Sequence, residues 1–207
     1  RRRFDHRRDT QVNGARMSIS RRETTIATSG NRPLYRSSFV SRSHQILKMG
    51  YDRLAASSLA ESDEEGITGE LTRSMQEFLQ DRSAPRWAKN FWAVEETRVH
   101  DSRRRGKKRF RLDIEIIQSQ PGPRPRFCFE AKRLRDASSR REYLGDDGLG
   151  CLLEGRYAGD NDVAGMLGYV QADTVTLHST ALQKKLTADP ERYSMLDGDQ
   201  WIPMKLV

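Results

Sequence analysis

Two short stretches, FRLDIEI at residues 110–116 and FCFEAK at residues 127–132, decide the fold of this 207-residue chain. In both stretches large apolar residues alternate with polar ones, and a period of two is typical of a β-strand with one buried face. The polar face of the first stretch carries Arg111, Asp113 and Glu115. We therefore predict two neighbouring strands that place carboxylates on the face away from their apolar side chains.

The sequence on either side supplies helices and further strands. Apolar residues of 67–79 recur at helical spacing and form one stripe, which predicts an amphipathic helix. We also predict a helix at 41–60, a strand at 91–99 and a turn at 101–109. Further along the chain we predict a Gly-interrupted helix at 150–170 and a short strand at 174–177. Residues 201–207 could form either a strand or a docked end. The expected fold is α/β, with a central mixed sheet of about four strands flanked by helices in the order α-β-β-β-α-β.

Positive charge is concentrated in two segments. The chain has 37 Lys and Arg against 29 Asp and Glu, a net charge of +8. Residues 1–22 hold eight Arg and two Asp, and residues 103–109 hold six basic residues, so the remainder is mildly acidic. We predict a basic, largely irregular N-terminal arm at 1–40 and one domain at 41–207 with its core at about 62–180. Basic projections suit phosphate contact, although a basic run is also typical of a solvated tail.

The sequence disfavours membrane and secretory classes of protein. No stretch reaches the roughly 18 consecutive apolar residues of a membrane span, and no secretory signal follows the N-terminus. Cys128 and Cys151 have neither metal-ligand spacing nor the pattern of a disulfide framework. We therefore expect a cytoplasmic protein with no membrane partner. The chain begins at Arg1, which fits a fragment or a processed product.

The carboxylates Asp113 and Glu130 lie within strands that should be central to the sheet. Burying a carboxylate costs free energy unless a partner compensates, and a divalent cation with oxygen ligands, such as Mg²⁺, is a natural partner. The backbone carbonyl of Ala131 could complete such a site. Lys132 shares the face of Glu130, where it could orient or deprotonate a water, or neutralise charge that develops on a phosphate.

This pair of strands resembles the PD-(D/E)xK nuclease superfamily, whose signature is an Asp near the end of one strand and an acidic-x-Lys triplet on the next. Asp113 and the Glu-Ala-Lys triplet at 130–132 carry the resemblance, which covers roughly residues 62–172. The resemblance implies a restriction-endonuclease-like core. The chain departs from the family at Leu112, where the signature has Pro.

The resemblance implies a Mg²⁺-dependent endonuclease, with Mn²⁺ able to substitute, that hydrolyses phosphodiester bonds of DNA. Asp113, Glu130 and a carboxylate on the preceding helix would hold one or two ions. Glu70, which lies off the apolar stripe of the 67–79 helix, fits that third position, and Glu115 is a rival for it. Lys132 would position the attacking water, so that a 3′-hydroxyl and a 5′-phosphate are released.

Further residues are assigned supporting roles. The predicted basic turn would bind backbone phosphates through Arg103, Arg104, Arg105, Lys107, Lys108 and Arg109. Gln171 either supports the site, as a Gln does in some branches of the superfamily, or is simply a polar residue at a helix end. Arg111 either contacts phosphate or pairs with Glu115.

Nucleic acid is the expected partner, DNA rather than RNA, bound by a homodimer or within a larger defence or repair complex. A role in defence against foreign DNA rests on analogy with the family alone. Two alternatives stay open. One is a nuclease-like fold without catalysis that serves as a nucleic-acid-binding or assembly subunit, and the other is an α+β domain whose strand charges are only solvated.

Overall fold

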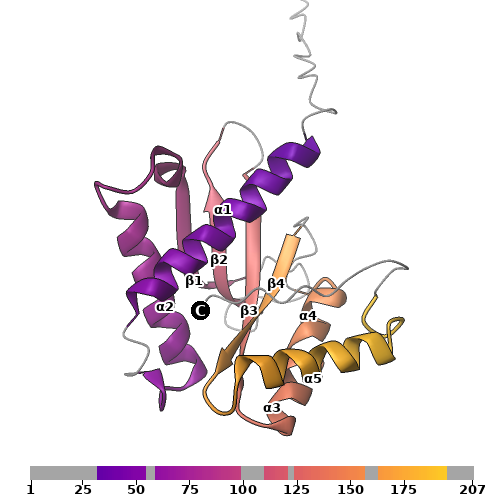
Figure 1. Ribbon diagram of the computed structural model, residues 1–207. Helices are drawn as coiled ribbons and strands as arrows, with labels where there is room; N and C mark the ends of the chain where they lie inside the picture. The colour runs from indigo at the N-terminus through magenta and orange to yellow at the C-terminus, as the bar shows by residue number, and fades with distance from the viewer. Residues whose placement is uncertain (1–31, 55–58, 99–109, 121–123, 157–162, 195–207) are drawn as a thin grey trace, which may run out of the picture.

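A computed structural model describes residues 32–54, 59–98, 110–120, 124–156 and 163–194. Its centre is a four-stranded mixed sheet with the strand order β1-β2-β3-β4 (Figure 1). The strands are β1 (Phe91–Arg98), β2 (Arg111–Gln118), β3 (Arg126–Leu134) and β4 (Val163–Val170). The first three pair antiparallel, and β4 pairs parallel with β3. This confirms the α/β class and the four-stranded mixed sheet.

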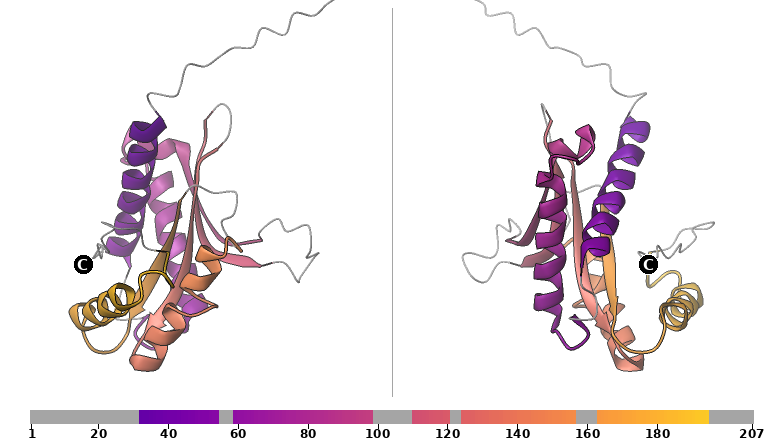
Figure 2. Two further views of the ribbon diagram at one scale, coloured as in Figure 1. Left: turned by 90° about the vertical axis from the view of Figure 1, so that its right-hand side faces the viewer. Right: turned by 60° about the vertical axis from the view of Figure 1, so that its left-hand side comes forward.

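Two long helices, α1 (Arg32–Arg53) and α2 (Glu64–Gln80), run alongside the sheet (Figure 2). The predicted apolar stripe of α2 is buried, and α2 begins where the side chain of Asp63 accepts a hydrogen bond from the Gly66 backbone N–H at 2.8 Å. A Cβ on Gly50 would overlap Met75, so glycine allows α1 and α2 to approach closely. The main core joins these helices to the strands through Ile46, Leu47, Leu71, Met75, Phe78, Ile114, Ile116, Phe127 and Phe129.

The remaining helices lie toward the end of the sheet where β3 and β4 finish (Figure 1). They are α3 (Ala137–Tyr143), α4 (Leu149–Leu153) and α5 (Val175–Ala188), and a 3₁₀ turn, η2 (Arg86–Asn90), precedes β1. A second apolar cluster joins α3 and α5 to the end of β3 through Leu134, Tyr143, Leu144, Leu182 and Leu186. No helix within the described ranges combines the length and apolar character needed to cross a membrane.

The predicted helix at 150–170 is wrong over its second half. The structure has the short helix α4 and then, at 163–170, the strand β4. Gly165 and Gly168 explain the difference, because a Cβ on either would crowd Phe129 or Leu134 of the neighbouring β3. A continuous apolar run is typical of a parallel strand with both faces covered, and such a run has no period that separates it from a helix.

Two other predicted elements also differ in the structure. Residues 174–177 are not a strand, because the Thr174 side chain accepts from the Leu177 N–H at 3.1 Å and begins α5. Residues 32–40, predicted as part of the irregular arm, already belong to α1. Residues 1–31, the segment 99–109 that contains the predicted turn at 101–109, and the tail at 201–207 lie outside the described residues.

Candidate active site

The candidate site forms where β2 and β3 stop pairing. The last paired residues at this end are Ile114 of β2 and Phe129 of β3. Asp113 precedes Ile114 and Glu130 follows Phe129, so these two are the first residues beyond the pairing. On its other edge, β3 continues to pair with β4 as far as Leu134. The backbone of β3 is therefore free of β2 at residues 130–132, which is where the predicted triplet lies.

The side chain of Asp113 bridges this separation. Its Oδ2 accepts a hydrogen bond from the Ala131 backbone N–H at 2.6 Å, in place of a backbone carbonyl of β2. Burial raises the pKa of Asp113 above its ordinary value, and the hydrogen bond from Ala131 works against that rise. This contact holds the Asp113 carboxylate beside Ala131, the residue that follows Glu130.

The ammonium group of Lys132 is held by three oxygens from two elements. Nζ donates to Oε1 of Glu130 at 2.8 Å, to Oε1 of Glu64 at 3.0 Å and to the Ala131 carbonyl at 2.8 Å. Burial alone would lower the pKa of Lys132, but hydrogen bonds and charge from Glu130 and Glu64 outweigh burial and hold the pKa above its ordinary value. Lys132 is therefore a cation at neutral pH, and all three of its protons have acceptors.

Glu130 is the most buried of these carboxylates, with a side chain only 5% exposed. Burial raises its pKa to about 7, the negative charge of Asp113 adds to the rise, and Lys132 opposes it. Its second oxygen, Oε2, is buried and has no hydrogen-bond partner in the part of the chain that the structure describes. An unpaired buried carboxylate oxygen is costly and marks a position that favours a cation or a hydrogen-bond donor.

The carboxylate that α2 brings to the site is Glu64 rather than the predicted Glu70. Glu64 uses one oxygen on Lys132 and the other to accept from the Arg133 backbone N–H at 3.1 Å. Glu70 is paired instead with Arg73 one turn further along the same helix, at 2.6 Å on the exposed side. The predicted helix began at residue 67 and left Glu64 outside it, whereas the observed α2 begins at Glu64.

Glu115, the predicted rival, lies deeper in the sheet and is only 2% exposed. It is opposite Cys128, where β2 and β3 still pair, and Arg126 Nη1 lies 3.1 Å from its Oε1. Arg111 pairs with Glu96 at 3.1 Å on the exposed side and not with Glu115. In the described part of the chain these two side chains therefore have Glu96 and Arg126 as their ion-pair partners, and not Lys132 or Glu130.

Gln171 follows β4 and ties three segments together. Its Nε2 donates to the carbonyls of Leu59 at 3.2 Å and Ser62 at 2.8 Å, and its Oε1 accepts from Arg135 Nε at 2.9 Å. Ser62 lies just before α2, so this amide fixes the start of the helix that carries Glu64. Gln171 therefore holds the segment that precedes Glu64, and it lies at the end of a strand and not of the predicted helix.

The donor set fits Mg²⁺ in its chemistry. Asp113, Glu130 and the Ala131 carbonyl all supply oxygen, and Mg²⁺ is commonly held by one or two carboxylates with waters and substrate phosphate as its other ligands. Among the residues that the structure describes, no three His, Cys, Asp or Glu side chains are grouped as a metal site.

The basic residues at 103–109, predicted to bind phosphate, lie outside the described residues. Comparison of the whole chain with protein-family models, with curated proteins and with solved structures finds no match. The case for a function therefore depends on the geometry of the site.

Proposed function

We propose that this protein is a Mg²⁺-dependent nuclease of the PD-(D/E)xK type, with a restriction-endonuclease-like fold, that hydrolyses phosphodiester bonds of DNA. The observation that carries the proposal is the meeting of Asp113, Glu130 and Lys132 at the point where β2 and β3 separate. The unpaired Oε2 of Glu130 supports it, because that oxygen lacks the partner that a cation would supply. The α-β-β-β-α-β order of elements is compatible with the proposed fold.

In this proposal each side chain has a distinct role in hydrolysis. Asp113 and Glu130 would hold Mg²⁺ together with the Ala131 carbonyl. The chemistry that bound Mg²⁺ supplies is positive charge beside the scissile phosphate and a lowered pKa for water. Lys132, as a cation, donates a hydrogen bond that orients the attacking water or stabilises charge on the phosphate oxygens. The water oxygen bonds to phosphorus and gives up a proton to solvent, the P–O3′ bond breaks, and the 3′ oxygen takes a proton from solvent, which leaves a 3′-hydroxyl and a 5′-phosphate.

The test is a titration of Mg²⁺ against the purified protein and supercoiled plasmid, with nicked and linear products read on a gel. Cleavage that rises with Mg²⁺ and stops in EDTA is expected. Single-stranded DNA and RNA of equal length, tested in parallel, decide the class of substrate. An absence of cleavage with Mg²⁺ and with Mn²⁺ on all three substrates contradicts the proposal.

The position of Glu64 leads to a prediction that contrasts two carboxylates of α2. Glu64→Gln is expected to lower the cleavage rate about 10- to 100-fold, because it removes a charged acceptor that positions Lys132. Glu70→Gln is the matched control and should stay within about threefold of the parent, since it alters only an exposed ion pair. The rates are measured on the same plasmid at saturating Mg²⁺. A larger effect at Glu70 than at Glu64 would restore Glu70 as the helical site residue.

One observation favours a second function, that of a nucleic-acid-binding or assembly subunit without catalysis. The three protons of Lys132 already have acceptors, so the ammonium must exchange one of them before it reaches a water or a phosphate. If Lys132 never exchanged these three acceptors, its ammonium group could not reach a water or a phosphate, and the protein would bind DNA without cutting it. Mg²⁺-independent binding with no cleavage, in the titration above, is the result that this alternative predicts.

A further inference from the structure

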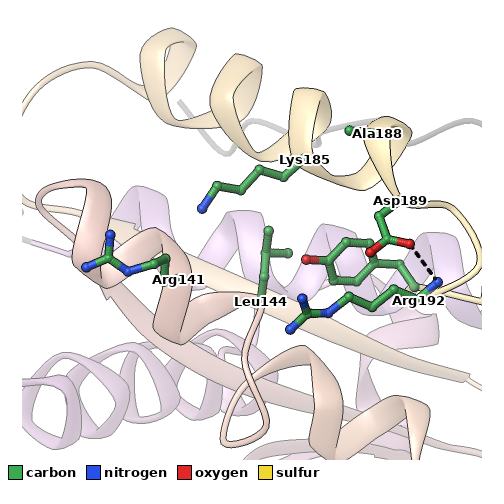
Figure 3. A pocket seen from close by; sticks show the side chains of 7 residues that line it. Arg141, Leu144, Lys185, Ala188, Asp189 and Arg192 are labelled. Atoms are coloured by element: carbon green, nitrogen blue, oxygen red, sulfur yellow. Dashed lines mark hydrogen bonds between the residues drawn. The ribbon is translucent and has the colours of Figure 1, made fainter.

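A cationic pocket of about 380 Å³ lies between α3 and α5, apart from the candidate active site. Figure 3 shows Arg141 from α3, Lys185 from α5 and Arg192 from the turn that follows, arranged around Leu144. Tyr193 adds an aromatic ring to the apolar wall. The pocket thus combines three long basic side chains with an apolar surface.

The positive charge of this pocket is not neutralised within the described ranges of the chain. Among the described residues, Asp189 is the one acidic residue that lines the pocket, and its Oδ1 accepts from the Arg192 backbone N–H at 3.3 Å. Arg141 donates to the Ser138 hydroxyl at 3.3 Å, and the guanidinium of Arg192 lies over the Tyr193 ring at 5.6 Å. None of the three cations has a carboxylate partner among the described residues, which leaves them free to bind an anion.

The positions of the cations favour an extended polyanion over a small enclosed anion. All three side chains are exposed and are spread over two helices and a turn. A small phosphate usually binds where buried donors converge on it, whereas exposed and separated cations suit the repeating phosphates of a nucleic acid. An apolar wall with an aromatic ring can also pack against the sugars or bases of a strand.

We propose that the pocket formed by Arg141, Leu144, Lys185, Arg192 and Tyr193 is an accessory site for the phosphate backbone of a nucleic-acid strand. The inference rests on the proposed function, since it names a second contact between the same protein and its substrate. Phosphate contacts at this pocket would position the strand without reading its sequence. Binding at this pocket does not require the metal or the chemistry of the active site.

The double variant Arg141→Gln/Lys185→Gln tests this inference in a binding assay. Fluorescence anisotropy with labelled single-stranded and duplex DNA is measured in EDTA over a range of salt concentrations, so that no cleavage interferes. We expect about a tenfold loss of affinity at low salt. The slope of the logarithm of the association constant against the logarithm of the salt concentration should be shallower by about 2, because two phosphate contacts are removed. Both side chains are exposed, so the fold should be kept, and circular dichroism checks this.

Lys184→Gln is the matched control, because Lys184 is exposed on α5 beside Lys185 but does not line the pocket. The inference is overturned if the double variant and the control bind with equal affinity and salt dependence, or if the parent binds no nucleic acid at low salt. Competition by a free nucleotide as strong as that by an oligonucleotide also overturns it, in favour of a small phosphorylated ligand. The proposed nuclease function is contradicted by a different result, namely that the parent protein binds nucleic acid normally but does not cleave it.

Discussion

Lys132→Ala is expected to lower Mg²⁺-dependent cleavage of DNA by about a thousandfold or more, while binding of DNA is retained. Lys132 contacts Glu130, Glu64 and the Ala131 carbonyl together. Removing a charge that is aimed at the reacting phosphate typically costs about 100- to 1,000-fold in rate. Removal of Lys132 also leaves two carboxylates without their shared partner, which adds to the loss.

A loss of activity could also arise from a damaged fold, because breaking a buried ion pair is strongly destabilising. The variant Lys132→Arg separates a loss of catalysis from a loss of the fold, since it keeps the positive charge but not the compact geometry of the ammonium group. We expect Lys132→Arg to keep the far-ultraviolet spectrum of the parent and still to lose at least about a hundredfold in rate. Lys48→Ala, at an exposed ion pair of α1, is the control for truncating a lysine. Cleavage by purified Lys132→Ala or Lys132→Arg at the parent's rate contradicts the assigned role.

The second large effect concerns the pH dependence of stability in the absence of metal. The pKa of Glu130 is raised to about 7 by burial and by the charge of Asp113. The folded protein therefore holds this proton more tightly than the unfolded chain does, and the free energy of unfolding falls as the pH rises from about 5 to 8. The loss can reach about 3 kcal/mol for this one group, at about 1.4 kcal/mol for each pH unit of difference in pKa.

Glu130→Gln should remove most of this pH dependence, because the amide does not titrate and can still accept the hydrogen bond from Lys132. Urea unfolding in EDTA at pH 5 and pH 8 measures the difference, and Glu142→Gln on the exposed side of α3 is the matched control. Mg²⁺ should restore stability to the parent at pH 8 and not to Glu130→Gln, since a ligand stabilises only a fold that binds it. The account of Glu130 is contradicted if the parent is equally stable at both pH values.

The alternating strands were predictable because their pattern reflects a physical asymmetry. In β2, Leu112, Ile114 and Ile116 are buried on one face of the strand and therefore recur with a period of two, whereas the opposite face carries polar residues, of which Glu115 is also buried. The expectation that Asp113 lies beside the triplet came from the resemblance to the nuclease superfamily, and in the structure Asp113 Oδ2 accepts from the Ala131 N–H. In β4 the apolar run has no such asymmetry, and its parallel pairing with β3 from Val163 to Val170 is a long-range contact that no local pattern reveals.

The role of Glu64 could not be predicted from the sequence, because it depends on long-range packing. Glu64 meets Lys132 from 68 positions away in the chain, and the segment before it is held by Gln171 from 109 positions beyond Ser62. The apolar stripe placed the start of the helix at residue 67, so Glu70 was on the predicted helix and Glu64 was not, although α2 begins at Glu64. The one local indication was Asp63, which caps α2 and places Glu64 in its first turn.

The central claim, that Asp113 and Glu130 share a metal ion, is tested most directly by a crystal structure of the protein soaked in Mn²⁺ and recorded with anomalous scattering. The account predicts one anomalous peak about 2.1 Å from a carboxylate oxygen of each residue, the spacing of octahedral hard-cation sites. It also predicts that Glu130 Oε2 becomes a ligand. A crystal with Mn²⁺ bound elsewhere, and with Lys132 still bridging Glu130 and Glu64, would contradict the claim.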